Sequence, residues 1–192
     1  MYFIGLDLGQ RRDFSAIAVI HRQDRMAAWS PNPRCSFLVR HLERMELGTS
    51  YVKVVQRVCD IMRDPIMLGQ SRLVVDATGV GAPVIDLLRH AGVGGRTTSV
   101  TITGGENAYG SDERWSVPKK DLLAGLEVLM EAGELTVSRH LQHAGSLLKE
   151  LAAMRPAADG PEHDDLALAL ALACWRARRA RIGFGTSRLP GI

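Results

Sequence analysis

A short apolar stretch at the start of the chain, ending in an aspartate, constrains the fold most strongly. Residues 2–6 predict a buried strand, and Asp7 follows it directly, ahead of Leu8 and Gly9. A carboxylate at the end of a buried strand is costly to desolvate unless a metal ion, an arginine or several N–H groups meet it. A polar turn and a second apolar run, residues 14–20, come next. We therefore expect a hairpin of two buried strands with Asp7 at one end.

This hairpin is compatible with three interpretations. Asp7 could be a metal ligand of an RNase H-like nuclease, or the hairpin could be the phosphate-binding turn of an actin-like or sugar-kinase ATPase. In the third interpretation Asp7 only caps a tight turn. An actin-like ATPase needs two duplicated subdomains, and a chain of 192 residues is too short for a second copy. The later acids must decide between the other two.

A second apolar segment also ends in an aspartate. Residues 72–75 predict a short strand, Asp76 ends it, and a glycine-containing turn and a helix follow. The carboxyl ends of strands are where α/β sheets place their active sites, although a turn aspartate ahead of a helix would look the same. The sequence contains no Gly-x-x-x-x-Gly-Lys-Ser/Thr motif, which excludes a P-loop motor.

The third acidic position lies at the start of an apolar helix. His163, Asp164 and Asp165 precede residues 166–175, which are apolar on every side of the expected helix and should pack against the sheet. Helix capping and the helix dipole explain one acid at such a position. Two adjacent acids with a histidine exceed what capping needs. His163 could orient a water molecule or the scissile phosphate, or it could cap the helix.

The remaining patterns predict an α/β fold with a central mixed β-sheet flanked by helices. An antiparallel half over residues 2–41 should include strands at 26–29 and 35–41. Further strands are expected at 97–103 and 135–137, and helices at 50–63, 84–90, 140–154 and from 116–118 onward. Residues 104–114 are rich in glycine and polar side chains and predict a mobile loop.

Length and composition are consistent with one domain. At 192 residues and 46% hydrophobic composition, we expect it to span residues 1–181, with 182–192 as a flexible tail. The three cysteines show no metal-ligand spacing, which favours reduced thiols in a cytosolic compartment. The sequence predicts neither a transmembrane helix nor a signal peptide. A net charge of +3, with arginine outnumbering lysine, leans toward a nucleic-acid partner.

The separated acids predict a metal-dependent phosphodiesterase chemistry. Asp7, Asp76 and one or both of Asp164 and Asp165 offer only oxygen ligands, which favours Mg²⁺ or Mn²⁺ over Zn²⁺. Carboxylates brought together without cations would repel one another, and divalent ions remove that penalty. Two ions about 3.5–4 Å apart would serve phosphodiester hydrolysis, with Asp7 bridging both.

Basic side chains near these elements are candidates for contacts with the DNA backbone. Lysines at a helix N-terminus oppose the helix dipole, so a phosphate contact would explain Lys119 and Lys120, and a solvated pair is the alternative. The arginines after the apolar helix could likewise face DNA or simply end a solvated helix. These arginines are Arg176, Arg178, Arg179 and Arg181.

Several motifs together resemble the nuclease domain of phage terminase large subunits, a family of the RNase H-like superfamily with retroviral integrases and Holliday-junction resolvases. The matching segments are residues 5–9, 75–81 and 163–167, with weaker likeness at 40–44, 103–105 and 117–119. The resemblance implies an RNase H-like fold, metal binding by Asp7, Asp76 and an acid of the Asp164–Asp165 pair, and metal-dependent cutting of concatemeric viral DNA. A full large subunit also carries an N-terminal packaging ATPase, which is absent here. We therefore expect either an excised nuclease domain or a stand-alone phage or prophage protein.

The resemblance also implies partners and leaves rival functions to test. Double-stranded DNA is the expected substrate, in the cytoplasm of a bacterial host and away from membranes. A packaging ATPase domain, a portal or a small terminase subunit are the expected protein partners. A junction resolvase, which acts as a symmetric dimer, or an RNA–DNA hybrid nuclease would keep the fold and change the substrate. A non-catalytic DNA-binding or assembly module is the alternative of another class, and the intact acids count against it.

Overall fold

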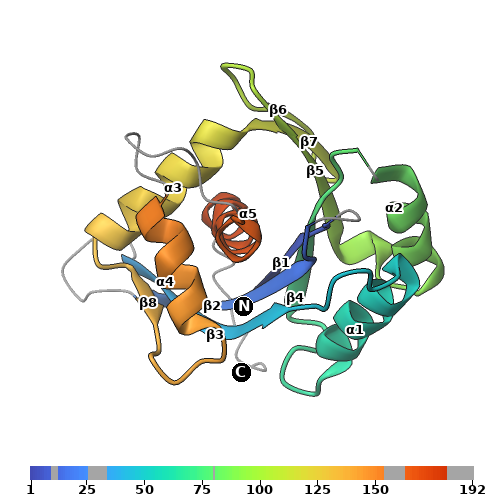
Figure 1. Ribbon diagram of the computed structural model, residues 1–192, viewed down its shortest axis with the longest axis horizontal. Coiled ribbons are helices and arrows are strands. Elements are labelled where there is room, and N and C mark those ends of the chain that lie inside the picture. The colour runs from blue at the N-terminus through green and yellow to red at the C-terminus, as the bar shows by residue number, and fades with distance from the viewer. Residues whose placement is uncertain (10–12, 26–33, 80, 154–162, 181–192) are drawn as a thin grey trace, which may run out of the picture.

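The protein is described by a computed structural model that covers residues 1–9, 13–25, 34–79, 81–153 and 163–180 (Figure 1). It is an α/β fold with a mixed sheet flanked by helices, as the sequence predicts. The strands are β1 (Tyr2–Asp7), β2 (Ala16–Arg25), β3 (Arg34–Arg44), β4 (Ser71–Asp76), β5 (Thr97–Thr103), β6 (Tyr109–Gly110), β7 (Arg114–Pro118) and β8 (Leu135–Val137). The helices are α1 (Tyr51–Arg63), α2 (Gly81–His90), α3 (Lys119–Glu131), α4 (Ala144–Ala153) and α5 (Asp165–Arg179), with a 3₁₀ turn at Gly94–Arg96.

The described strands form one sheet in the order β6-β7-β5-β4-β1-β2-β3-β8. β1, β2 and β3 are antiparallel, which confirms the predicted hairpin, and Asp7 is paired with Ala16 across it. β4 lies parallel to β1 on the other side, and β5 and β7 continue the parallel half. The carboxyl ends of β1 and β4 therefore meet at one edge of the sheet.

Helices cover both faces of the sheet (Figure 1). α3, α4 and α5 pack on one face and α1 and α2 on the other. Because side chains alternate along a strand, Phe3 of β1 belongs to the α5 side, whereas Ile4 and Leu6 contribute to the core under α1 and α2. The same alternation places Asp7 on the α5 side. No helix within these residues is long and apolar enough to cross a membrane.

α5 is the central helix of its layer, and it lies directly on β1. Its residues from Asp165 to Trp175 are all buried, as its uniformly apolar sequence predicts. The close approach depends on Gly5, because a Cβ atom there would lie 1.8 Å from the carbonyl oxygen of Ala169. A glycine in the middle of β1 thus brings the first turns of α5 over the carboxyl end of the strand.

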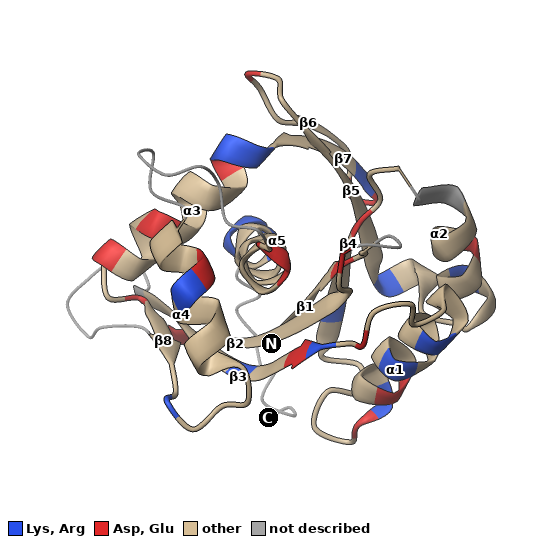
Figure 2. Ribbon diagram, in the orientation of Figure 1, with Lys and Arg blue, Asp and Glu red and all other residues tan. Residues whose placement is uncertain are grey.

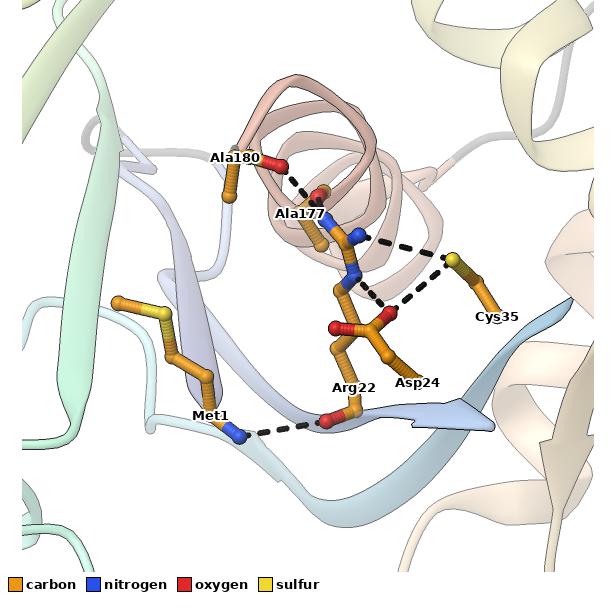
Figure 3. Close-up of polar contacts among 6 residues, drawn as sticks. All are labelled: Met1, Arg22, Asp24, Cys35, Ala177 and Ala180. Carbon is orange, nitrogen blue, oxygen red and sulfur yellow. Dashed lines mark hydrogen bonds and ion pairs between the residues drawn. The ribbon is translucent and has the colours of Figure 1, made fainter. Parts of the chain in front are cut away.

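Arg22 of β2 holds the opposite, C-terminal end of α5 (Figure 3). Its side chain is 6% exposed, and its guanidinium donates to the carbonyl oxygens of Ala177 and, at 2.9 Å, of Ala180. Its Nε atom also donates to Asp24 at 2.8 Å. The last carbonyl groups of a helix lack the usual intrahelical partners. The Ala177 carbonyl also accepts a 3.2 Å bond from the N–H of Ala180, and Arg22 adds a donor to both carbonyls.

Three expected helix starts are wrong. The helix expected over 84–90 begins at Gly81, because a proline such as Pro83 is tolerated within the first turn of a helix. The helix expected from residues 116–118 begins at Lys119, because the preceding residues form β7, which pairs with β5 and buries Val117. The helix expected over 140–154 begins only at Ala144, after a turn in which His143 has a φ of 64°. The expected strand at 26–29 and the expected tail at 182–192 lie outside the described residues.

Candidate functional site

Asp7 and Asp76 are neighbours at the edge of the sheet. β1 and β4 run parallel with Leu6 opposite Val75, so the next residue of each strand is one of these aspartates. Asp76 and Val74 are two residues apart and therefore lie on the same face of β4. Val74 packs in the core under α5, so both carboxylates lie on the α5 side. In Figure 2 acidic positions gather between the ends of β1 and β4 and the near end of α5.

The first turn of α5 adds the remaining predicted acids. Asp164 is its N-cap residue and Asp165 its first helical residue, and the Asp164 side chain makes no capping hydrogen bond. Both carboxylates are close enough to Asp7 to act on its ionisation. The structure therefore brings all four acids predicted from the sequence to one place.

Asp7 is the most strongly perturbed of these acids. It is 8% exposed, and no cationic side chain of the described residues forms an ion pair with it. Burial raises the pKa of Asp7 well above its ordinary value, and the charges of Asp76, Asp165 and Asp164 raise it further. Its carboxyl group is also close enough to Asp76 to hydrogen-bond to it when protonated.

Asp76 is held in a local turn. Its Oδ1 atom accepts a hydrogen bond of 2.8 Å from the backbone N–H of Thr78, whose hydroxyl accepts one of 2.8 Å from the N–H of Ile102 on β5. Burial raises the pKa of Asp76, while the hydrogen bonds from Thr78 and the charge of Lys119 oppose that rise. This turn orients one carboxylate oxygen and leaves the other for a ligand.

Asp164 and Asp165 meet different cations. Asp164 is ion-paired with Lys119 at the start of α3. Asp165 is 4% exposed, and its Oδ2 lies 3.5 Å from Nη2 of Arg44 without a hydrogen-bond partner among the described residues. Burial raises the pKa of Asp165, and the charges of Arg44 and His163 oppose the rise. Asp165 is thus the acid of this pair with an unused buried oxygen.

A buried ion pair supports the acids, and sequence reasoning missed it. Glu150 of α4 is 5% exposed, pairs with Arg44 at the end of β3, and accepts a hydrogen bond of 2.9 Å from the backbone N–H of Ala167. Glu150 therefore caps the first turn of α5 from a neighbouring helix. Burial raises its pKa, whereas the Ala167 hydrogen bond and Arg44 lower it. The available signal was a glutamate at a core-facing position of α4, three residues after the buried Leu147.

His163 lies beside this pair but does not cap the helix by a hydrogen bond. Its ring is half-buried and contacts Phe14 edge-on, with centroids 5.3 Å apart, and the Arg44 guanidinium lies 5.0 Å from the same Phe14 ring. The buried Nδ1 atom of His163 has no partner among the described residues. The structure thus leaves one buried ring nitrogen without a partner among the described residues.

The predicted basic residues divide between two places. Lys119 lies at the acids through its ion pair with Asp164, and the neighbouring Lys120 pairs with the exposed Glu106. The structure does not bring the arginines to the acids. Arg176, Arg178 and Arg179 occupy the last turn of α5, and Arg181 lies outside the described residues.

The acids offer the oxygen ligands that a hard divalent cation prefers, but they are not arranged as a complete ligand shell. Among the described side chains, no three His, Cys, Asp or Glu residues are arranged around a single ion position. Two of the carboxylates instead face cationic side chains: Asp164 pairs with Lys119, and Oδ2 of Asp165 lies 3.5 Å from Nη2 of Arg44. Asp7 is buried without a cationic partner among the described residues, and Oδ2 of Asp165 lacks a hydrogen bond there; oxygen ligands of this kind suit Mg²⁺ or Mn²⁺.

Comparison with solved structures identifies the class to which this fold belongs. The nuclease domain of the P22 large terminase superimposes with a TM-score of 0.60 at 14% identity, over 94% of this chain and 82% of that domain. The manganese-soaked, inhibitor-bound human cytomegalovirus terminase nuclease domain gives 0.57 at 14% identity, over 91% and 82%. Thermus thermophilus RuvC gives 0.50 at 15% identity, over 96% and 98%.

These similarities establish the fold. The chain has the RNase H-like fold that terminase nuclease domains and RuvC share, as the sequence resemblance implies. No protein-family model matches the sequence, and no curated protein matches it. At identities of 14–15%, the activity must be argued from the chain's own residues.

Proposed function

We propose that this protein is a metal-dependent DNA endonuclease of the terminase large-subunit type. The observation that carries the proposal is the convergence of four carboxylates at one sheet edge around a buried Asp7 that lacks a cationic partner. A fold needs no such cluster for stability, because buried like charges destabilise it. The shared fold of the terminase nuclease domains supports the same activity.

The chain's own residues would hold one or two divalent ions. Asp7 and Asp76 come from adjacent strands, and the third ligand comes from the Asp164–Asp165 pair, where Asp165 has the unused buried oxygen. Mg²⁺ or Mn²⁺ bound there supplies the positive charge that neutralises these acids and stabilises the attacking and leaving oxygens of phosphodiester hydrolysis. Manganese was soaked into the cytomegalovirus domain of the same fold.

Other side chains at the edge would position the DNA. Lys119 and Lys120 can exchange their acidic partners for backbone phosphates, since both ion pairs are exposed on the lysine side. His163 is half-buried beside Asp165 and is the candidate for orienting a water molecule or the scissile phosphate. Phosphate contacts of this kind carry no sequence information, so binding to double-stranded DNA should be largely non-specific and should weaken steeply with salt.

The same comparison supports a role in packaging viral DNA. A domain over residues 1–181 would work with a packaging ATPase domain, a portal or a small terminase subunit, and would cut concatemeric viral DNA in the cytoplasm of a bacterial host. The P22 and cytomegalovirus proteins are terminases by name, and this chain shares the fold of their nuclease domains.

Cleavage of supercoiled plasmid tests the proposal. The protein is incubated with plasmid in EDTA, Mg²⁺ or Mn²⁺, and nicked and linear products are resolved on a gel. We expect cutting only with a divalent ion, and we expect Asp7→Asn to lower it by more than about 100-fold because it removes a charged metal ligand.

A matched aspartate serves as the control. Asp60 on α1 is 55% exposed and lies outside the acid cluster, so Asp60→Asn should cut like the wild type. Equal cutting by Asp7→Asn and the wild type would refute the proposed site. DNA binding without cutting in any metal would instead favour the non-catalytic assembly module.

A Holliday-junction resolvase is the second candidate, because RuvC matches 96% of this chain over 98% of its own length. A terminase-type nuclease should cut linear duplex as readily as a four-way junction. A strong preference for junctions, together with a stable dimer by light scattering, would favour the resolvase. Cutting confined to RNA–DNA hybrids would instead favour an RNA–DNA hybrid nuclease of the same fold.

A further inference from the structure

A second polar cavity lies at the end of α5 opposite the acids. It measures about 610 Å³ and is bounded by the amino-terminal ends of β1, β4 and β5 and by the last turn of α5. Asp165 and Arg176 mark the two ends of the helix, and at about 1.5 Å per residue they are separated by roughly 16 Å along its axis. This cavity is therefore distinct from the proposed active site.

Arginines line this cavity and lack acidic partners. Arg72, Arg96, Arg176 and Arg179 all contribute to its wall, and none forms an ion pair with any residue that the structure describes. Their polar contacts with the described residues are few. Arg72 donates to the Ser71 carbonyl at 3.2 Å, Arg96 to the Ser71 hydroxyl at 3.5 Å, and Arg176 through Nε to the Thr98 hydroxyl at 3.2 Å. Most of their N–H donors have no acceptor in the part of the chain that the structure describes.

Burial makes this grouping of cations unfavourable without an anion. Burial lowers the pKa of Arg176, and the nearby Arg72 lowers it further, although Asp112 opposes both. Arg176 is half-buried, so its charge is only partly hydrated. A planar guanidinium offers paired donors that match the oxygens of a phosphate or a carboxylate, and several arginines together suit the higher charge of a phosphate.

An adjoining cavity offers a second unmet group. It measures about 240 Å³ and shares Asp112, Arg176 and Arg179 with the first, and Trp115 and Trp175 complete its wall. Trp175 is 5% exposed, and its indole N–H has no acceptor among the described residues. A buried donor without an acceptor is destabilising, so a ligand oxygen or ring nitrogen at this point would remove a real penalty.

The site is also rigidly framed. Arg22 fixes the carbonyl oxygen of Ala180, which lines the larger cavity, and Figure 3 shows how its guanidinium closes the end of the helix. The Arg179 guanidinium lies 4.4 Å from the centre of the Trp175 ring and so links the two cavities. A site whose walls are already held loses little conformational entropy when a ligand binds.

We propose that these two cavities together bind a nucleotide. Its phosphate would lie among Arg72, Arg96 and Arg176, and an acceptor on the nucleoside would receive the indole N–H of Trp175. Hydroxyl or amino groups of the nucleoside would donate to Asp112 or Glu113, which line the larger cavity beside the arginines. These acids explain why a nucleotide fits better than a bare phosphate, and the larger cavity alone falls in the volume range of small-molecule sites. The nucleotide could be free or could be the 5′-phosphorylated end of a DNA strand.

Equilibrium binding without metal tests this site apart from the proposed nuclease. The full chain is titrated in EDTA at constant ionic strength with adenosine 5′-monophosphate, with adenosine, and with a hexanucleotide bearing either a 5′-phosphate or a 5′-hydroxyl. Tryptophan fluorescence and the indole N–H resonance of Trp175 report binding. We expect saturable binding of a phosphorylated ligand, at least about tenfold tighter than that of its unphosphorylated counterpart, since the charged contacts are lost with the phosphate. The tighter of the two phosphorylated ligands identifies the source.

Matched substitutions decide whether the arginines are responsible. Arg96→Gln and Arg72→Gln should each weaken binding by about tenfold. Arg63→Gln, which alters an arginine that is 60% exposed on α1, should leave binding unchanged. Plasmid cleavage by the Arg96→Gln and Arg72→Gln proteins should stay at the wild-type level and serves as a check of their folding. Absence of saturable binding, equal binding of adenosine and its monophosphate, or indifference to both substitutions would overturn the proposal, whatever the outcome of the cleavage assay.

Discussion

The two ends of α5 lie in opposite electrostatic surroundings. At the C-terminal end, Arg22 donates to the carbonyl oxygens of Ala177 and Ala180, so the end of the helix is satisfied by a buried cation. At the N-terminal end, four carboxylates converge, and burial together with mutual repulsion raises the pKa of Asp7. At the C-terminal end Arg22 thus stabilises the end of the helix, while at the N-terminal end the buried Asp7 carries an electrostatic penalty.

The magnitudes show that the acids do not serve the helix. A carboxylate at a helix N-terminus contributes about 0.3–1 kcal/mol through the helix dipole. Desolvating an ionised carboxylate without a partner costs several times more, about 2 kcal/mol or above for a polar group alone. Asp164 does not even use its side chain for capping, and Glu150 supplies the capping acceptor from α4 instead. The comparison of the two ends therefore favours a ligand, not helix stability, as the reason for the acid cluster.

The substitution with the largest expected effect acts on both ends at once. In Gly5→Ala the new methyl group would lie 1.8 Å from the Ala169 carbonyl oxygen, so α5 must move off β1. We expect a loss of about 4 kcal/mol in the free energy of unfolding, measured by urea denaturation, and a matching loss of cleavage. Gly145→Ala is the control, since a methyl group there meets nothing within 4 Å. A stable, active Gly5→Ala protein would contradict the close seating of α5.

Arg22→Met should separate stability from function. The substitution keeps an apolar stem in the core but removes the guanidinium that donates to the carbonyl groups of Ala177 and Ala180 and to Asp24, so we expect a loss of about 3 kcal/mol in the free energy of unfolding. Cleavage per folded molecule should persist, because the acids lie at the other end of the helix. Arg63→Met on the exposed face of α1 should change stability by less than about 0.5 kcal/mol. Loss of cleavage in fully folded Arg22→Met would show that the two ends are coupled.

The parts of the fold that the sequence could predict are those with a local cause. The apolar run ahead of Asp7, the strand ahead of Asp76 and the uniformly apolar α5 each follow from their own residues, and all are present. β7 was missed because its polar residues precede a proline that also suits a helix start. Only its pairing with β5, through Val117, makes it a strand.

The supporting residues of the site depend on contacts between distant segments. Arg44 and Glu150 lie 106 residues apart, and neither has a sequence neighbour that indicates the ion pair. The sequence also could not show that the basic residues lie in two different places, because the lysines of α3 and the arginines of α5 gave the same local signal. The fold places Lys119 at the acids and Arg176 at the far end of the helix.

Glu150→Ala tests the supporting pair at the acidic end. It removes the acceptor for the Ala167 N–H and leaves Arg44 without its main partner, so we expect a loss of about 2 kcal/mol in the free energy of unfolding. Glu150→Gln keeps an acceptor and should lose about half as much. Glu127→Ala, at an exposed position of α3, is the control. Equal effects of Glu150→Ala and Glu127→Ala on urea denaturation would refute the capping role of Glu150.

Asp7→Asn is expected to have the smallest effect on stability, and unlike the other substitutions it should raise the free energy of unfolding. The pKa of Asp7 is raised in the folded protein by burial and by the neighbouring acids, so the folded state binds a proton more tightly than the unfolded state. Below the pKa that Asp7 has in the unfolded chain, Asp7 is protonated in both states and does not change the free energy of unfolding. As pH rises through the raised pKa of the folded protein, ionisation destabilises the wild type, whereas asparagine does not ionise. Asp7→Asn should therefore be more stable than the wild type by about 1 kcal/mol in EDTA near neutral pH, with the difference shrinking toward low pH.

Divalent metal should reverse that order. An ion that binds only the folded wild type stabilises it by mass action, so the wild type should regain its deficit as Mg²⁺ or Mn²⁺ is added, and Asp7→Asn should respond far less. Thermal unfolding of both proteins across pH, with EDTA and with metal, measures this directly. A wild type that is more stable than Asp7→Asn in EDTA near neutral pH would mean that Asp7 is satisfied by the protein alone. The contrast between the two ends of α5 would then lose its functional meaning.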